Sequence, residues 1–173
     1  MLFRSPSTGV HLVIAGRVPH PGRRPNLFPD VRRKVIDAGL HGTVHFPGFI
    51  DEEDKAALMQ LATAFVFPST YEGFGLDPLE ALRAGTPVVC ANRTSLPELM
   101  GEAAIMFDPD TPGELATILG RIWRDEGLRN DLAARGPRQA ERFTWEDCAR
   151  LTFDAYRAAI DAHKRPSDSG RAP

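Results

Sequence analysis

Five short and continuous runs of apolar residues constrain the fold of this chain more than any other feature. They occupy residues 11–15, 43–46, 64–67, 87–90 and 104–107, and the segments between them have helical spacing. Continuous runs of this length are typical of strands that are covered on both faces, as they are in a parallel sheet. The order of strands and helices therefore predicts an α/β fold with a doubly wound, mostly parallel sheet.

Charge and composition narrow the class of protein. The 173 residues carry a formal net charge of −2, without the basic excess of a nucleic-acid binder, so no nucleic-acid partner is expected. The apolar runs are far shorter than the roughly 18 residues that indicate a membrane span, and the N-terminus lacks an apolar stretch of signal-peptide length. We therefore expect a cytoplasmic protein. The two cysteines, Cys90 and Cys148, have no metal-ligand spacing and are interpreted as small buried apolar groups.

The length of the chain suits one domain with a full core, and we predict a single folded domain over residues 1–163. Helical spacing continues through residues 128–142 and from Trp145 to about His163. The tail over residues 164–173 holds Pro, Ser and Gly but no large apolar residue, so it is expected to be disordered. Residues 17–26, rich in Pro, Gly and Arg, are expected to form a solvated surface loop.

Four loops that follow predicted strands are candidates for a binding site, because ligands bind beyond the carboxyl ends of the strands in an open parallel sheet. They are residues 16–26, 47–52, 68–77 and 91–95. The third loop stands out because it carries Glu72, two glycines around Phe74, and then a second carboxylate at Glu80. Glycines let a ligand approach the backbone closely, and the free N–H groups of a helix that starts at Pro78 suit an anion such as a diphosphate.

The two carboxylates of this segment have two possible roles. Each can accept hydrogen bonds from a pair of hydroxyl groups, so Glu72 and Glu80 could together hold the hexose and the ribose of a nucleotide sugar. Alternatively, Glu80 completes a capping box with Asp77 at the start of a helix that ends at Gly85, and Glu72 is a solvated loop residue. Spacing alone does not decide between these alternatives.

Six motifs, in order along the chain, carry a resemblance to a known family. They are Leu-Val-Ile-Ala-Gly, Val-His-Phe-Pro-Gly-Phe, Ala-Phe-Val-Phe-Pro-Ser-Thr-Tyr-Glu-Gly-Phe-Gly-Leu, Leu-Glu-Ala-Leu-Arg-Ala-Gly-Thr-Pro-Val-Val, Ser-Leu-Pro-Glu and Phe-Thr-Trp-Glu. Through them the chain resembles the retaining glycosyltransferases of family 4, which have the GT-B fold, over residues 11–159. The resemblance implies a Rossmann-like domain that binds a nucleotide-diphosphate sugar.

The resemblance assigns a role to each candidate residue. Glu72 would hold hydroxyl groups of the donor sugar and is the candidate catalytic residue, and Glu80 would hold the ribose. Lys55 would lie close to the base, or else it is an ordinary lysine on the surface of a helix. The remaining contacts would come from the backbone of Gly73, Phe74, Gly75 and Leu76 to sugar and phosphate, and from Ile50 and Asp51 to the base. No cofactor or metal is implied beyond the nucleotide-sugar substrate.

In the GT-B fold the active site lies in the cleft between two domains, and the resemblance covers only the second, donor-binding domain. The acceptor domain and the first βα unit of the donor domain, with an Arg and a Lys that meet the diphosphate, are not matched. The expected partner is therefore an N-terminal acceptor domain or a separately encoded half, and any peripheral membrane association would come only through that domain. This chain alone is expected to transfer sugar weakly or not at all, and its last helix to leave apolar surface exposed. Two alternatives are a non-catalytic nucleotide-sugar-binding module and another GT-B enzyme, such as a sugar-nucleotide epimerase.

Two further patterns resemble metal-binding motifs but have simpler explanations. Asp108 and Asp110 lie between a predicted strand and a predicted helix, where aspartate favours turns. His41 and His45 are four residues apart, but a strand is predicted to begin between them, which rules out a pair of ligands on one helix. No metal site is therefore predicted.

Overall fold

The computed structural model describes residues 2–5, 9–17, 30–111 and 113–164. The chain divides into two compact units, Met1–Ala140 and Glu141–Pro173. The predicted disordered tail lies outside the described residues except for residue 164, and so does most of the predicted loop over residues 17–26. The candidate loops at residues 47–52, 68–77 and 91–95 belong to the first unit and are described in full.

The five predicted strands are all present in the first unit. They are β2 (Gly9–Ala15), β3 (Val44–Gly48), β4 (Phe65–Phe67), β5 (Val88–Ala91) and β6 (Ala104–Phe107). β2 pairs with β3, β4 with β5, and β5 with β6, and each of these pairs is parallel. The prediction of an α/β fold with mainly parallel strands is confirmed.

Hydrogen bonding divides the strands into two three-stranded sheets rather than one. Their orders are β1-β2-β3 and β4-β5-β6, and among the described residues no ladder joins the two. The strand β1 (Leu2–Ser5) is an addition to the predicted strands, and it runs antiparallel to β2 with Leu2 opposite Leu12. A four-residue strand that ends in Arg and Ser has no periodic pattern of its own, so only its pairing with β2 defines it.

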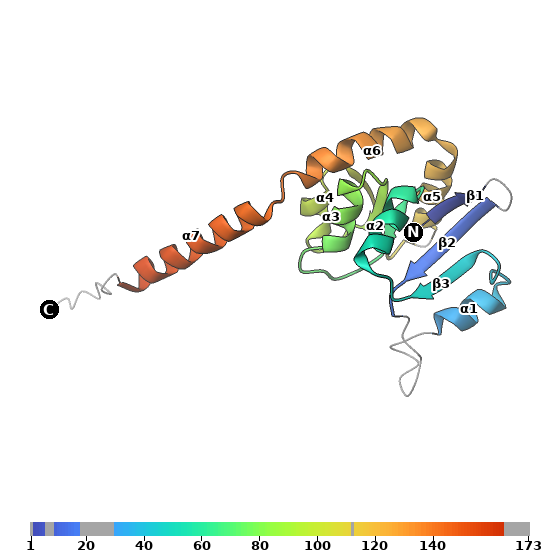
Figure 1. Cartoon of the computed structure of the whole chain (residues 1–173), viewed down its shortest axis with the longest axis horizontal. Helices are drawn as coiled ribbons and strands as arrows, with labels where there is room; N and C mark the ends of the chain where they lie inside the picture. The colour runs from blue at the N-terminus through green and yellow to red at the C-terminus, as the bar shows by residue number, and fades with distance from the viewer. Residues whose placement is uncertain (1, 6–8, 18–29, 112, 165–173) are drawn as a thin grey trace. The chain divides into compact units, whose positions relative to one another are not determined.

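Carboxylate side chains start several of the helices. The first unit contains α1 (Val31–Asp37), α2 (Glu52–Leu61), α3 (Leu76–Arg83), α4 (Leu96–Met100), α5 (Glu114–Arg124) and α6 (Glu126–Ala140), and the second unit contains α7 (Trp145–Lys164) (Figure 1). Asp30, Asp51 and Asp125 each accept a hydrogen bond from the backbone N–H three residues further on. Such bonds satisfy N–H groups that the first helical turn leaves unpaired.

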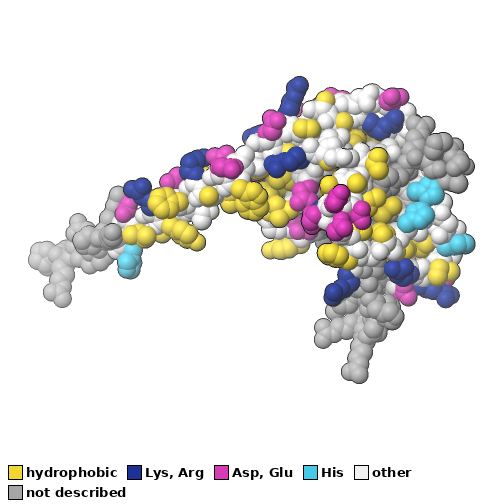
Figure 2. Space-filling model, in the orientation of Figure 1, with side chains coloured by type: hydrophobic (Ala, Val, Ile, Leu, Met, Phe, Trp, Pro, Cys, Tyr) yellow, Lys and Arg dark blue, Asp and Glu magenta, His cyan; other side chains and the backbone are white. Residues whose placement is uncertain are grey.

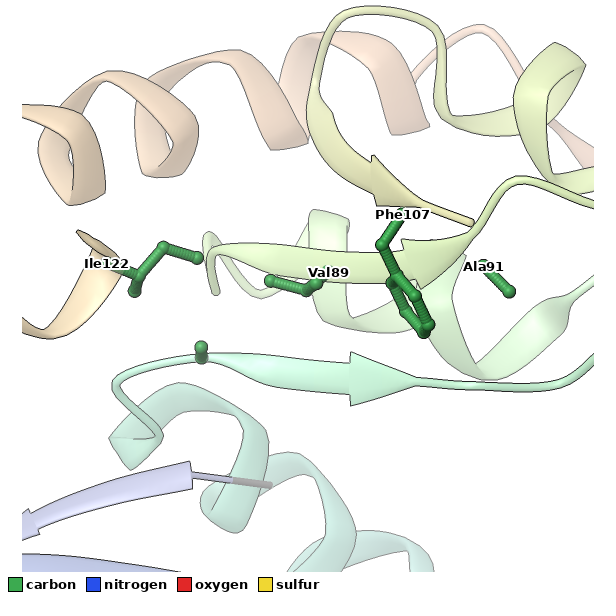
Figure 3. Close-up of a cluster of buried hydrophobic side chains, with 5 residues drawn as sticks. Val89, Ala91, Phe107 and Ile122 are labelled. Carbon is green, nitrogen blue, oxygen red and sulfur yellow. The ribbon is translucent and has the colours of Figure 1, made fainter. Parts of the chain in front are cut away.

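The core of the first unit lies on both faces of β5, whose four residues are all buried. On one face, Val89 and Ala91 pack with Phe107 of β6 and Ile122 of α5 (Figure 3). Neighbouring residues of a strand point to opposite faces, so the fully buried Val88 is covered on the other face. Burial on both faces explains why this strand is a continuous apolar run in the sequence.

Helix α3, which follows the third candidate loop, is held at its end and along its side. Gly85 follows the helix with φ of 74°, and its N–H donates to the carbonyl of Leu82 at 3.0 Å, as predicted for a glycine stop. Along its side, α3 packs against α6. The buried Gly136 of α6 faces the backbone of α3 so closely that a Cβ there would lie 2.8 Å from the carbonyl oxygen of Leu82. The position of α3 therefore depends on a residue without a side chain in α6.

Helix α7 of the second unit carries large apolar side chains that are exposed. They are Trp145, Leu151, Phe153, Tyr156 and Ile160, and each is more than half exposed. Among the described residues, no helix is both long enough and apolar enough to cross a membrane.

The two cysteines differ in accessibility. Cys90 in β5 is buried, as predicted, and this burial raises its pKa to about 11. Cys148 in α7 is exposed, so the prediction that both cysteines are buried is wrong for this residue. The reason is that every residue of α7 from Trp145 to His163 is exposed, whatever its polarity.

Treatment of the native chain with a maleimide is therefore expected to modify Cys148 and spare Cys90. The thiolate is the reactive form, and both burial and a raised pKa disfavour it at Cys90. Mass spectrometry at neutral pH should show one adduct, located on the peptide that contains Cys148, and two adducts after denaturation in guanidinium chloride. The Cys148→Ser variant is the control and should stay unmodified in its native state. Rapid modification of Cys90 in that variant would contradict the buried position of β5.

Candidate functional site

The segment that connects β4 to α3, residues 68–75, is called the Glu72 loop below. It turns at Gly75, whose φ of 109° lies in the left-handed region that residues with a side chain rarely adopt. A Cβ at this position would also lie 3.0 Å from Cδ2 of Leu96 and 3.3 Å from Cγ of Pro78. Conformation and space therefore both require glycine at the point where the loop enters α3.

The start of α3 differs from the prediction. The helix begins at Leu76 with Gly75 as its N-cap, and no side chain caps it. Because the turn at Gly75 brings the chain into the helix early, Asp77 is a helical residue rather than the cap, and Pro78 is in the first turn, where its missing N–H costs no helical hydrogen bond. Glu80 therefore cannot form a capping box with Asp77, and the capping explanation for Glu80 is wrong.

A hollow of about 480 Å³ lies beside the Glu72 loop. Its lining consists of Phe67, Glu72, Phe74, Gly75, Leu76 and Asp77. Glu72 is half-buried, whereas Phe74 and Leu76 are exposed. The structure thus brings the residues predicted to contact sugar and phosphate around one opening, with Gly73 between two of them in the chain.

Lys55 of α2 joins carboxylates from two helices. Its Nζ lies 2.7 Å from Oε2 of Glu52, 2.8 Å from Oε2 of Glu80 and 4.0 Å from Oδ1 of Asp77. The Lys55 side chain is only 22% exposed, and its hydrogen bonds to Glu52 and Glu80 raise its pKa above the ordinary value. Lys55 is therefore a charged bridge between α2 and α3 and not an isolated surface lysine.

Acidic side chains gather over α2 and α3 (Figure 2). Burial raises the pKa of Asp77, the charge of Lys55 opposes this rise, and the charges of Glu80, Glu52 and Glu72 add to it. The other three carboxylates are thus close enough to Asp77 to act on it. Glu72 and Glu80, which were paired by their spacing in the sequence, both lie near the Asp77 carboxylate.

Ile50 and Asp51, the predicted neighbours of the base, lie immediately before α2. The Asp51 carboxylate accepts from the N–H of Asp54 at 2.8 Å, and the Asp51 carbonyl accepts from the N–H of Lys55 at 2.9 Å. Ile50 is half-buried and Asp51 is exposed. A backbone hydrogen bond therefore connects Asp51 to Lys55, and the Lys55 side chain is bound to Glu80.

The loop over residues 91–95 contacts the Glu72 loop, and the sequence contains no sign of these contacts. The hydroxyl oxygen of Thr94 accepts a hydrogen bond from the N–H of Glu72 at 3.1 Å. The hydroxyl of Ser95 lies 2.8 Å from the carbonyl oxygen of Phe74 and 3.2 Å from that of Glu72. Each of these bonds joins residues more than twenty positions apart, and no periodicity or local motif indicates such a pairing.

Arg93 attaches the same loop to the end of β6. Its guanidinium group lies 2.7 Å from Oδ1 of Asp108 and 2.5 Å from Oδ2 of Asp110. The Asp108 carboxylate also accepts from the backbone N–H of Asp110 and from the hydroxyl of Thr111. The hydrogen bond from Asp110, together with Arg93, lowers the pKa of Asp108. The two aspartates form a turn, as predicted, and an ion pair in addition.

Two of the described histidines lie on neighbouring strands. His45 contacts His11 on the neighbouring strand, with 2.8 Å between the two ring nitrogens. Across the described parts of the chain, no group of three or more His, Cys, Asp or Glu side chains could hold a metal ion. A second hollow of about 700 Å³ is lined mainly by apolar residues of α1 and β3, together with Arg32, His41 and His45, and it includes none of the predicted site residues.

The parallel strands, the helices that cover them and the Glu72 loop at the carboxyl end of β4 define a Rossmann-like domain of the GT-B glycosyltransferase class. The chain belongs to the family described as glycosyl transferases group 1, whose model matches residues 4–139.

Three relatives illustrate the similarity. O-antigen chain mannosyltransferase B from Escherichia coli is 40% identical over 129 residues, which are 74% of this chain and 34% of that protein. The structure of sucrose-phosphate synthase from Thermosynechococcus elongatus matches with a TM-score of 0.75 and 28% identity, over 88% of this chain and 39% of that one. Anabaena HepE in complex with UDP has the same fold, with a TM-score of 0.73, 22% identity, and coverage of 86% and 41%. The chain thus spans about a third of the length of the mannosyltransferase that it matches.

Proposed function

We propose that the hollow beside the Glu72 loop binds a nucleotide-diphosphate sugar, and that the chain is the donor-binding part of a retaining glycosyltransferase of family 4. The observation that carries this proposal is the placement of two carboxylates at one site. Glu72 lines the hollow, and Glu80 shares the ammonium group of Lys55 with Asp77, which also lines it. The capping box is excluded for Glu80, and a ligand that binds to both glutamates accounts for their spacing as well as their position at one site.

The two glutamates take different parts of the ligand. A carboxylate has two acceptor oxygens and can bind a pair of neighbouring hydroxyl groups. Glu72, in the loop, accepts from hydroxyls of the donor sugar. Glu80, in α3, accepts from the 2′ and 3′ hydroxyls of the ribose, and its Oε2 keeps the hydrogen bond to Lys55 while Oε1 faces the ribose. Ile50 and Asp51, connected to Glu80 through Lys55, contact the base.

The diphosphate binds to backbone N–H groups and not to the carboxylates, which would repel it. Residues 73–76 enter α3 without any side-chain cap, and the uncapped N-terminus of a helix attracts an anion through its N–H groups and its dipole. The acceptor hydroxyl attacks on the face from which the diphosphate departs, so no side-chain nucleophile is needed. Glu72 then acts by orienting the sugar, and groups aimed at the departing diphosphate stabilise its charge.

The first donor sugar to test is suggested by a relative of the chain. The relative from Escherichia coli is a mannosyltransferase, which makes a nucleotide-diphosphate mannose the first donor to test. Because the chain spans about a third of that relative, we propose sugar transfer for the whole protein and donor binding for this chain. The direct test is therefore binding and not turnover.

Titration of the 173-residue chain with GDP-mannose, UDP-glucose and ADP-glucose tests the proposal. At a ligand concentration about 100 times the dissociation constant, binding stabilises the folded state by about 2.7 kcal/mol, which raises the melting temperature by roughly 5 °C or more for a chain of this size. One of the three nucleotide sugars is expected to produce this shift in differential scanning fluorimetry. The absence of a shift with all three would remove donor binding from the proposal.

Replacing Glu72 with alanine is expected to weaken binding of the selected nucleotide sugar about tenfold, because the hydrogen bonds of a charged acceptor are lost. Binding of the corresponding nucleoside diphosphate, which has no sugar hydroxyls, should change little. Isothermal titration calorimetry measures both. Glu53→Ala, at an exposed glutamate in the first turn of α2, is the matched control and should bind both ligands normally. Equal losses for both ligands in Glu72→Ala would contradict the assignment of Glu72 to the sugar.

A further inference from the structure

Two neighbouring hydroxyl groups hold the backbone of the Glu72 loop. Thr94 accepts from the N–H of Glu72 at 3.1 Å, and Ser95 lies within hydrogen-bonding distance of the carbonyls of Glu72 and Phe74, at 3.2 and 2.8 Å. The single hydroxyl proton of Ser95 is directed to one carbonyl or shared between the two. The backbone N–H of Glu72 and the carbonyls of Glu72 and Phe74 are thus all within hydrogen-bonding distance of the same two adjacent hydroxyl groups.

The backbone of Thr94 has an unusual conformation. Its φ of 49° makes it the one residue other than glycine with positive φ in the described parts of the chain. A β-branched residue rarely adopts this conformation, and such outliers are concentrated at functional sites. Thr94 is exposed, so packing in the core does not explain why it is there. In this conformation the hydroxyl oxygen of Thr94 accepts the hydrogen bond from the N–H of Glu72.

The residues on either side of Thr94 and Ser95 are held by contacts with the rest of the first unit. Arg93, directly before them, is bound to Asp108 and Asp110 at the end of β6. Leu96, directly after them, is fully buried, and its Cδ2 lies so close to the turn at Gly75 that a Cβ at that position would be only 3.0 Å away. Residues 93–96 therefore contact the Glu72 loop at Glu72, Phe74 and Gly75 while they are themselves anchored to the core.

We propose that Thr94 and Ser95 are positioning residues for the donor sugar. They fix the peptide groups on either side of the Glu72 side chain, and so they set the direction in which its carboxylate meets the sugar hydroxyls. The inference rests on the proposed function, since it takes Glu72 as the sugar contact. It assigns no contact between the two hydroxyls and the nucleotide, whose ribose and base are assigned to Glu80 and Ile50.

The test compares a nucleoside diphosphate with its sugar conjugate on variants of the full chain. Thr94→Gly and Ser95→Ala are each expected to weaken GDP-mannose binding about 3- to 10-fold, which is the effect of one lost hydrogen bond. Binding of GDP, which has no sugar for Glu72 to hold, should weaken less than about twofold. Isothermal titration calorimetry measures both affinities. UDP-glucose and UDP are used instead if the ligand panel selects uridine. Thr94→Ser keeps the hydroxyl and should bind like the parent. Thr117→Ala, which removes a hydroxyl bonded to a backbone carbonyl in α5, is the control.

A second measurement follows the loop itself. Because Thr94 accepts the N–H of Glu72, hydrogen exchange of a peptide that covers residues 71–75 should be faster in Thr94→Gly and unchanged in Thr94→Ser. Glycine readily adopts positive φ, so Thr94→Gly is expected to fold normally.

Three outcomes would overturn the inference. Normal GDP-mannose binding by both Thr94→Gly and Ser95→Ala would show that the hydroxyls do not position the sugar. An equal loss of GDP and GDP-mannose would assign them to the nucleotide side. If the parent chain binds no nucleotide or nucleotide sugar, the proposed function itself fails and this inference with it, whereas the first two outcomes leave the proposed function intact.

Discussion

Replacing Gly136 with valine is expected to destabilise the first unit by about 3 kcal/mol or more, and replacing it with alanine by about 2 kcal/mol. A Cβ at this position would lie 2.8 Å from the carbonyl oxygen of Leu82 and 3.3 Å from its Cα, and neither atom can rotate away because both belong to the backbone of α3. The helices must separate to admit the new atom. The usual gain from replacing a helical glycine with alanine, about 0.5–1 kcal/mol, offsets only part of this cost.

Urea unfolding of these variants measures the effect. Trp123 of α5 packs on the core of the first unit, so its fluorescence reports the unfolding of that unit, and a Trp145→Phe background removes the signal of the second unit. Gly127→Ala in the same helix is the control, because its Cβ would meet only a side-chain oxygen of Asp125 at 3.4 Å. It should leave stability unchanged or raise it. Equal stability of the alanine variants at 127 and 136 would contradict the close packing of α3 on α6.

The sequence was sufficient to predict the buried strands of the first unit. β5 is covered on both faces, and its continuous apolar run indicated this directly. The strand β1 could not be predicted, because its four residues form a strand only through their pairing with β2. The sequence likewise does not show which strands are hydrogen-bonded to each other, and the predicted single sheet is found as two three-stranded sheets. Such pairing is a property of two segments together and leaves no pattern in either one.

At the candidate site, sequence spacing predicted that Glu72 and Glu80 act together, but it did not predict which residues from other parts of the chain contact them. Glu72 and Glu80 could be paired because only seven residues separate them, across the end of a loop and the start of the helix that follows it. The start of that helix was predicted two residues too late, at Pro78 instead of Leu76. Asp77 is a residue type that often caps helices, but the left-handed Gly75 is the N-cap here. Lys55, Thr94 and Ser95 reach the site through the tertiary fold, and only the structure identifies what they contact.

The second large effect is expected at Glu80. The Glu80→Ala variant should bind the selected nucleotide sugar roughly 30- to 100-fold more weakly, since a charged acceptor of the ribose hydroxyls is removed and the freed Lys55 turns fully to Glu52. The melting temperature of the ligand-free chain should fall by no more than about 3 °C, because a partly exposed ion pair contributes at most about 1 kcal/mol. A large loss of binding with a small loss of stability separates ribose recognition from a purely structural ion pair.

A 2′-deoxynucleotide makes the assignment specific. The parent chain should prefer GDP to 2′-deoxy-GDP, or UDP to 2′-deoxy-UDP, and Glu80→Ala should lose that preference because no acceptor remains for the 2′ hydroxyl. Glu52→Ala, which removes the other partner of Lys55 but leaves Glu80 in place, is the matched control and should keep the preference. If Glu80→Ala still distinguishes the ribonucleotide from the deoxynucleotide, then Glu80 does not hold the ribose. Its ion pair with Lys55 would then be its whole role, and the base and ribose would have to bind elsewhere along the Glu72 loop.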